Sequence, residues 1–148
     1  MGPAGPTAMP GYMFAHPVLG LAAVALILAA FSMKTGQWRF WTLHYLTGLL
    51  AGAVGLTAFS VAILVVARRY ADTGGHPNLP LVASAHLVLA VLALLCLLAQ
   101  VALGLAVHYV LGGPPRFLRY HRRNGRLLVV LAIGLLLLGL ATLSTLKV

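Results

Sequence analysis

The stretch LVASAHLVLAVLALLCLLAQVALGLAVHYV, from Leu81 to Val110, decides the fold. Its 30 residues include no Lys, Arg, Asp or Glu, and its only imidazole and amide side chains are His86, Gln100 and His108. About 20 consecutive apolar residues are enough for one helix to cross the hydrocarbon core of a bilayer. The stretch therefore predicts a transmembrane helix, with lipid as its main solvent.

Three similar apolar runs accompany this stretch, at about Phe14–Met33, Thr42–Ala67 and Phe117–Leu146. Short breakers separate the runs, so neighbouring helices must be adjacent and antiparallel. The composition agrees, because charged residues make up 7% of the chain, against about 25% in soluble domains. We predict an all-α integral membrane protein: an irregular tail at residues 1–13, then one up-down four-helix bundle at residues 14–148.

The net charge of +9 comes from ten Lys and Arg against a single acidic residue, Asp72. The basic residues lie mostly in or beside the short loops, which is typical of membrane topology signals and argues against nucleic acid as a partner. The side of the N-terminus holds three of them, and the other side holds Lys34, Arg39, Arg116, Arg119, Arg122, Arg123 and Arg126. This asymmetry predicts that both termini lie on the non-cytoplasmic side.

The scarcity of carboxylates also limits the chemistry of the chain. There is no Glu, which excludes paired-carboxylate catalysis and acidic proton relays. The single cysteine, Cys96, cannot form an internal disulfide. We therefore predict no catalytic residues.

Four histidines fall at two depths. His16 and His86 begin the first and third runs on one side of the membrane, whereas His44 and His121 begin the second and fourth runs on the other side. Alternate helices of an up-down bundle are diagonal, so each depth offers two facing imidazoles, in layers roughly 15–25 Å apart. Two imidazoles fill both axial positions of a haem iron and leave it only electron transfer. We therefore expect two haem b groups, one on His16 and His86 and one on His44 and His121.

A small residue stands four positions after each of these histidines: Gly20, Gly48, Ala90 and Gly125. Residues four apart share one helix face, so these positions leave space for a flat macrocycle beside the imidazole. The pattern continues at Gly52 and Gly55. Close helix packing through small residues is an alternative explanation of the same pattern.

Other polar residues of the apolar runs have several possible roles. Arg122 and Arg126, close to His121, are expected to pair with haem propionates, while the remaining arginines set the topology. His108 is on the same face as His86 and is an alternative ligand, a residue of a quinone or propionate site, or an interfacial side chain. Gln100 requires a hydrogen-bond partner inside the bundle.

Four segments carry a resemblance to a known family: His16-Pro17-Val18-Leu19-Gly20, Trp41-Thr42-Leu43-His44, His86 to Gln100, and His121-Arg122-Arg123-Asn124-Gly125-Arg126. They resemble the cytochrome b561 superfamily in a minimal four-helix form, and the resemblance covers about residues 14–144. The most specific match is the His-x-x-x-Gly-Arg pattern that opens the last run. The resemblance implies two b haems, one near each membrane side, and electron transfer from ascorbate, quinol or a fused donor domain.

The function expected from these features is transmembrane electron transfer by a dihaem b-type subunit of a larger redox complex. Its expected partners are lipid, other redox subunits and, as a candidate, quinone. Alternatives are a quinol- or ascorbate-linked transmembrane oxidoreductase, a chlorophyll- or bacteriochlorophyll-binding protein, and a structural subunit of a photosynthetic or respiratory complex. A bacterial inner membrane and an organelle membrane, thylakoid or mitochondrial, suit this composition equally.

Overall fold

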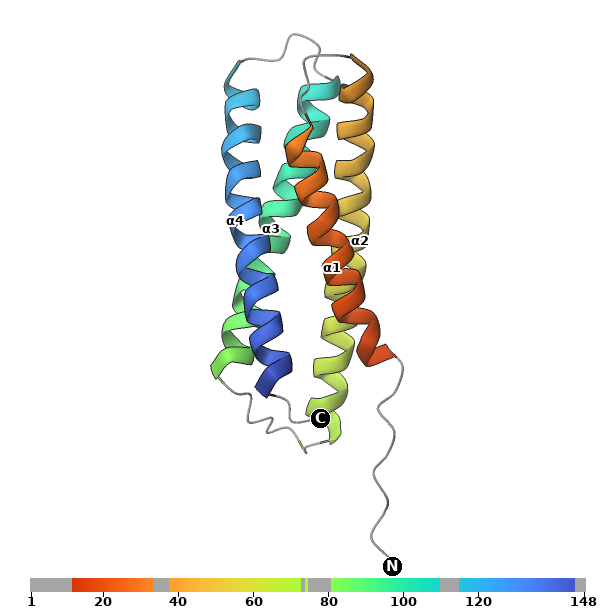
Figure 1. Ribbon diagram of the computed structural model, residues 1–148, viewed down its shortest axis with the longest axis vertical. Helices are drawn as coiled ribbons and strands as arrows, with labels where there is room; N and C mark the ends of the chain where they lie inside the picture. The colour runs from red at the N-terminus through yellow and green to blue at the C-terminus, as the bar shows by residue number, and fades with distance from the viewer. Residues whose placement is uncertain (1–11, 34–37, 73, 75–80, 110–114, 146–148) are drawn as a thin grey trace, which may run out of the picture.

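The computed structural model describes residues 12–33, 38–72, 74, 81–109 and 115–145, and it is helical in four segments (Figure 1). The predicted all-α fold with four long helices is confirmed. Helix α1 begins two residues inside the predicted tail, and residues 1–11 of that tail lie outside the described part of the chain. The helices are α1 (Tyr12–Ser32), α2 (Trp38–Asp72), α3 (Leu81–Tyr109) and α4 (Pro115–Thr145).

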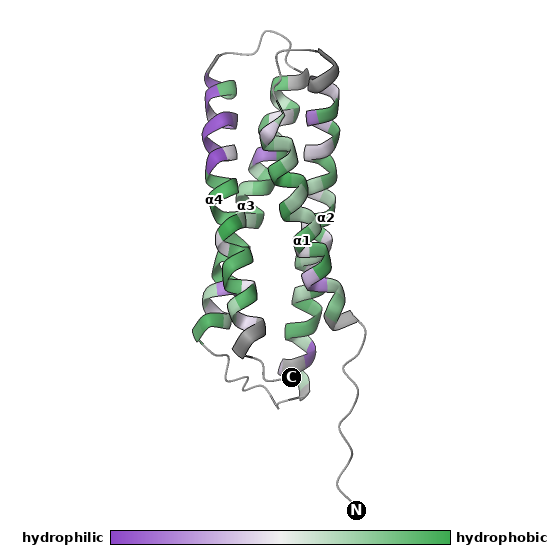
Figure 2. Ribbon diagram, in the orientation of Figure 1, coloured by the Kyte–Doolittle hydropathy of each residue, from purple (hydrophilic) through white to green (hydrophobic). Residues whose placement is uncertain are grey.

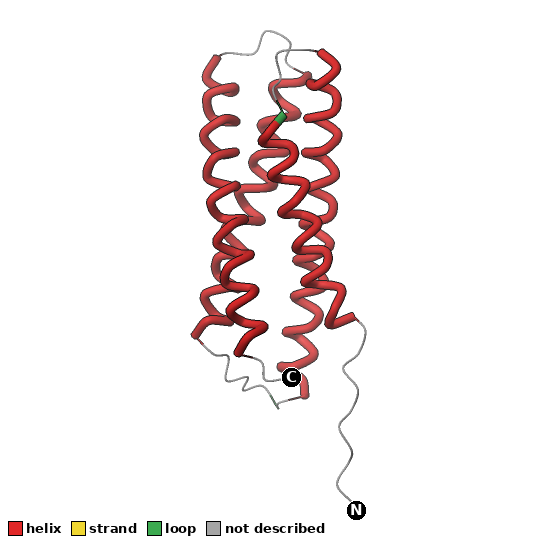
Figure 3. Tube along the Cα trace, in the orientation of Figure 1, coloured by secondary structure: helices red, strands yellow, loops and turns green. Residues whose placement is uncertain are grey.

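The bundle consists of two helical hairpins. Helix α1 packs mainly against α2, and α3 packs mainly against α4, while α1 with α4 and α2 with α3 form the looser contacts between the hairpins. Among the described residues, the backbones of α1 and α3 are not in contact, nor are those of α2 and α4, so these are the diagonal pairs. The start of α1 and the end of α4 lie at the same end of the bundle (Figures 1 and 3). Which membrane side this end faces stays a prediction.

All four helices are long and apolar enough to cross a membrane. Apolar residues cover most of their length, and hydrophilic residues gather at one end of α4 (Figure 2). Large apolar side chains point outwards, for example Leu64, 66% exposed, and Val130, 65% exposed. This surface suits lipid, because exposed apolar patches of this extent are rare on soluble monomers.

Small residues form much of the interior where the helices cross. Ala51 is 1% exposed and Ala132 is 2% exposed. A Cβ atom added at Gly55 would lie 2.7 Å from Leu97 Cδ2 of α3. One added at Gly52 would lie 3.1 Å from Val101 Cγ2. Small residues let membrane helices approach closely, and the packing explanation therefore accounts for Gly52 and Gly55.

Candidate functional site

The structure brings the four histidines together as two pairs that cross between the hairpins. The ring centroids of His16 (α1) and His86 (α3) are 6.3 Å apart, and the ring planes meet at 87°. The ring centroids of His44 (α2) and His121 (α4) are 6.0 Å apart, with an angle of 78°. Each pair joins diagonal helices, as the sequence pattern predicts, and spans the looser interface of the bundle.

The histidines of the first hairpin are fixed by backbone carbonyls of the neighbouring helix. His16 Nδ1 lies 3.0 Å from the Ala58 carbonyl oxygen, and His44 Nδ1 lies 2.8 Å from the Ala30 carbonyl oxygen. A carbonyl oxygen only accepts hydrogen bonds, so Nδ1 donates and the lone pair of each ring is on Nε2. Metal-bound histidines are oriented in the same way, with the second ring nitrogen donating to a carbonyl or carboxylate.

The two contacts of the first hairpin are related by an approximate twofold symmetry. Ala30 lies 14 residues after His16, and Ala58 lies 14 residues after His44. Fourteen residues correspond to about 21 Å of helix. This is the approximate separation of the two histidine layers along α2, and it falls within the range predicted from the sequence.

The histidines of the second hairpin face glycines instead of carbonyls. An ideal Cβ at Gly104 would lie 3.4 Å from His121 Cε1, and one at Gly139 would lie 3.5 Å from His86 Cε1. The Nδ1 atoms of His86 and His121 are buried and have no hydrogen-bond partner among the described residues. These two rings therefore pack against a glycine backbone, and His121 has a further contact, from its Nε2 to the Gln100 amide nitrogen at 3.2 Å.

Gly104 and Gly139 were missed by the sequence analysis, although the sequence contains a signal for both. Gly104 follows His86 by 18 residues, and Gly139 follows His121 by 18 residues. Eighteen residues are five full turns, so each glycine shares the face of the histidine on its own helix. In an antiparallel hairpin, that face meets the histidine of the partner helix.

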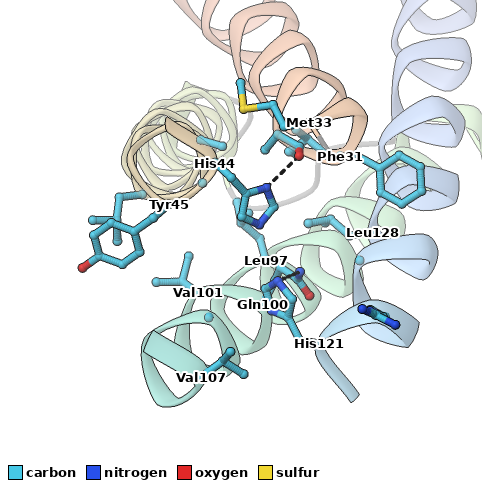
Figure 4. A pocket seen from close by; sticks show the side chains of 18 of the residues that line it. Phe31, Met33, His44, Tyr45, Leu97, Gln100, Val101, Val107, His121 and Leu128 are labelled. Atoms are coloured by element: carbon cyan, nitrogen blue, oxygen red, sulfur yellow. Dashed lines mark hydrogen bonds between the residues drawn. The ribbon is translucent and has the colours of Figure 1, made fainter. Parts of the chain in front are cut away.

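A cavity of about 350 Å³ adjoins the His44–His121 pair. Figure 4 shows both imidazoles beside this space, with Gln100 of α3 lying against His121. All four helices contribute to its walls, and Arg122 and Arg126 are part of the lining. Both arginines are exposed. From this position both side chains can reach the propionates of a haem in the cavity, and these contacts stay a prediction.

The small residues beside the histidines differ in their surroundings. Added Cβ atoms at Gly20 and Gly48 would meet nothing within 4 Å. At Gly125, in contrast, an added Cβ would lie 3.2 Å from the Gln100 amide nitrogen. Ala90 is half-buried on α3. Gly20 and Gly48 therefore leave open space beside an imidazole, whereas the space beside Gly125 holds the Gln100 side chain.

Gln100 has the internal partners that its position in the apolar run requires. Its amide nitrogen lies 3.2 Å from His121 Nε2, and its amide oxygen accepts a hydrogen bond of 2.9 Å from Asn124. Asn124 also donates to the Cys96 carbonyl oxygen at 2.8 Å. Asn124 had no predicted role, although an amide close to a proposed ligand in an apolar helix is a signal that the sequence contains.

The separation of the paired rings fits a shared metal. Two metal–nitrogen bonds of about 2.0 Å and two nitrogen-to-centroid distances of roughly 1.1 Å give ring centroids roughly 6 Å apart. Within the described residues, no group of three or more His, Cys, Asp or Glu side chains could hold a metal ion. The donor set of each pair is thus two imidazoles, which is a ligand set of b-type haem. His108 lies in α3, but its side chain is outside the described residues.

Comparisons of the chain with protein-family models, with curated proteins and with solved structures returned no match. The interpretation of the site therefore depends on its own geometry.

Proposed function

We propose that this chain is a dihaem b-type cytochrome that transfers electrons across a membrane, with an architecture like that of the cytochrome b561 superfamily. One observation carries the proposal: two pairs of histidines face each other across the bundle at 6.3 and 6.0 Å. Each pair takes one imidazole from each hairpin. A haem iron held by two imidazoles exchanges electrons and has no free axial position for oxygen or substrate.

One histidine from each hairpin would hold each proposed haem. His16 and His44 present Nε2 because their Nδ1 atoms donate to the Ala58 and Ala30 carbonyls. His86 and His121 complete the pairs from the second hairpin. At the His44–His121 site, open space beside Gly48 and the lining arginines, Arg122 and Arg126, suit a macrocycle with charged propionates.

The distance between the two sites supports electron transfer through the bundle. The layers are about 21 Å apart along α2, against a hydrocarbon core of about 30 Å. Each site then lies close to one membrane surface. A donor on one side and an acceptor on the other can approach different sites, which is the arrangement that a transmembrane carrier needs.

Pairing distinguishes this function from the pigment-binding alternative. A chlorophyll-type pigment is held by a single histidine, so four pigments would require four separate imidazoles. The observed rings instead lie in pairs, and the two rings of a pair are too close for each to bind its own macrocycle.

We further propose that the chain acts with other redox subunits, with lipid around it and quinone as a candidate partner, in a bacterial inner membrane or an organelle membrane.

Electron transfer across vesicles tests the proposed function. The purified protein is loaded with haemin and reconstituted into vesicles that contain ferricyanide, and dithionite is added outside. We expect the trapped ferricyanide to be reduced at a rate that depends on the loaded protein. The His86→Ala variant, which interrupts the path at one layer, serves as the control. Equal rates for the two proteins and for empty vesicles would contradict the proposal.

A further inference from the structure

A polar cluster lies beside the His44–His121 pair and its cavity, and the function proposed above does not require it. It consists of Gln100, Asn124 and His121, together with the Cys96 carbonyl. The described residues include two side-chain amides, Gln100 and Asn124, and both lie at the His44–His121 site. The two sites therefore differ in composition even though their histidine pairs have similar geometry.

The hydrogen bonds of this cluster have a fixed direction. The Cys96 carbonyl can only accept, so the atom 2.8 Å from it must be the Asn124 amide nitrogen. The same nitrogen lies 2.9 Å from Gln100, so the amide oxygen of Gln100 must face Asn124. The amide nitrogen of Gln100 is then left to donate to His121 Nε2 at 3.2 Å.

This direction determines which nitrogen of His121 carries the proton. Because Nε2 accepts a hydrogen bond, the neutral ring must hold its proton on Nδ1. Nδ1 is buried and has no acceptor among the described residues. The chain of hydrogen bonds from Asn124 through Gln100 to His121, which we call the relay, therefore selects this tautomer. It does so although the buried Nδ1 donor is left unsatisfied, which costs free energy.

The relay occupies the coordination position of His121 and part of the space beside it. The Nε2 lone pair of His121, which would bind the iron, is taken by the Gln100 amide. The space beside Gly125 is also taken, because Gln100 Nε2 lies 3.2 Å from the position of an added Cβ there. The space beside Gly48 at this site and beside Gly20 at the other site is open, so the contact of Gln100 with His121 is the feature that distinguishes the two sites.

We propose that Gln100 is a positioning residue that holds His121 in the ligand-ready tautomer and occupies its coordination position until haem binds, so that the two sites fill in order. The His16–His86 site fills first, and the His44–His121 site binds haem more weakly because the Gln100 hydrogen bond must break. This inference rests on the haem-binding function proposed above. Haem binding would replace the Gln100 hydrogen bond at His121 Nε2 with a bond to iron, the iron would give up a solvent ligand, and no electron or proton would be transferred.

Haemin titration of the metal-free protein in detergent tests the order of filling. His86→Ala isolates the His44–His121 site, and His121→Ala isolates the other. Adding Gln100→Leu to the His86→Ala protein should tighten haemin binding about two- to tenfold, the range of one net hydrogen bond. Adding the same change to the His121→Ala protein should leave binding unchanged. No tightening, equal tightening at both sites, or tighter wild-type binding at the His44–His121 site would overturn the proposal.

Nitrogen-15 NMR of the metal-free protein gives a second readout, which does not depend on haem. The wild-type His121 ring should show its proton on Nδ1, and Gln100→Leu should change the tautomer populations. A proton on Nε2 in the wild type would overturn the inference about Gln100. If the proton is on Nδ1 but no variant binds haemin, the proposed function fails while the relay itself stands.

Discussion

The two hairpins of this bundle hold their histidines by different means. In the hairpin of α1 and α2, each imidazole donates from Nδ1 to a carbonyl of the neighbouring helix. In the hairpin of α3 and α4, each imidazole packs against a glycine, and Nδ1 has no partner among the described residues. Each histidine pair takes one ring from each hairpin, so each pair combines a ring that donates to a carbonyl with a ring that packs against a glycine. His121 is in addition hydrogen-bonded to Gln100 at Nε2.

This difference indicates that the two histidines of each proposed haem site have different roles. A hydrogen bond to a carbonyl fixes both the tautomer and the orientation of a ring. His86, whose Nδ1 has no such hydrogen bond among the described residues, can rotate or shift at a smaller cost, whereas His121 must first give up its hydrogen bond to Gln100. The first hairpin therefore provides a ligand held by a backbone carbonyl at each proposed site, and the second provides a ligand whose contacts can change when haem binds.

The largest expected effect comes from removing one ligand of a pair. His86→Ala should abolish haem binding at the His16–His86 site and leave the other site occupied, so the haem content should fall from two per chain to one. His121→Ala should do the same at the opposite layer, because each pair is a separate site. Pyridine haemochrome assays of the purified variants measure this. Loss of both haems, or of neither, from either variant would break the assignment of pairs.

A large side chain at Gly48 should exclude the macrocycle from the His44–His121 site. The open space beside Gly48 would be filled in Gly48→Leu, so we expect about one haem per chain in the same assay. Gly48→Ala is the matched control, since its added Cβ meets nothing within 4 Å and should leave two haems. Full haem content in Gly48→Leu would show that the macrocycle does not occupy this space.

The packed rings should be sensitive to their glycines in a site-specific way. Gly104→Leu would push against His121, and Gly139→Leu would push against His86, because each glycine backbone adjoins a ring. Each variant should weaken haemin binding by at least tenfold at its own site only. Alanine at either position makes an ordinary contact of 3.4–3.5 Å and should have little effect. Equal losses at both sites would indicate general misfolding of the second hairpin.

The smallest effect is expected where glycine serves helix packing alone. Gly55→Ala places a Cβ 2.7 Å from Leu97 Cδ2, and overpacking of this kind costs about 1–3 kcal/mol. The end of a leucine side chain can move, so the lower part of this range is expected in the free energy of unfolding. Haem content should not change. If Gly55→Ala lost haem as Gly48→Leu is expected to, the distinction between packing and cofactor glycines would be wrong.

The helices could be predicted from the sequence to within a few residues. Long apolar runs leave no alternative to helices in lipid, and short breakers leave little choice of topology. The pairing of His16 with His86 and of His44 with His121 followed from depth and connectivity alone. The layer spacing followed from the rise of a helix.

The supports of the histidines could not be predicted in the same way. The contact between His16 and the Ala58 carbonyl depends on the axial offset between α1 and α2. The sequence does not specify that offset. Gly52, Gly55 and Gly48 follow one pattern in the sequence. In the structure, Gly52 and Gly55 lie where α3 packs against α2, whereas Gly48 faces open space. The sequence pattern alone does not distinguish these positions.

The measurement that tests the central claim most directly is the haem content of the purified wild-type chain, determined as the pyridine haemochrome and combined with a reduced-minus-oxidised spectrum. Two b-type haems per chain, with the narrow α band of low-spin iron between two imidazoles, are the predicted result. A chain that binds no haem after expression and haemin reconstitution, or that carries a different chromophore, would contradict it.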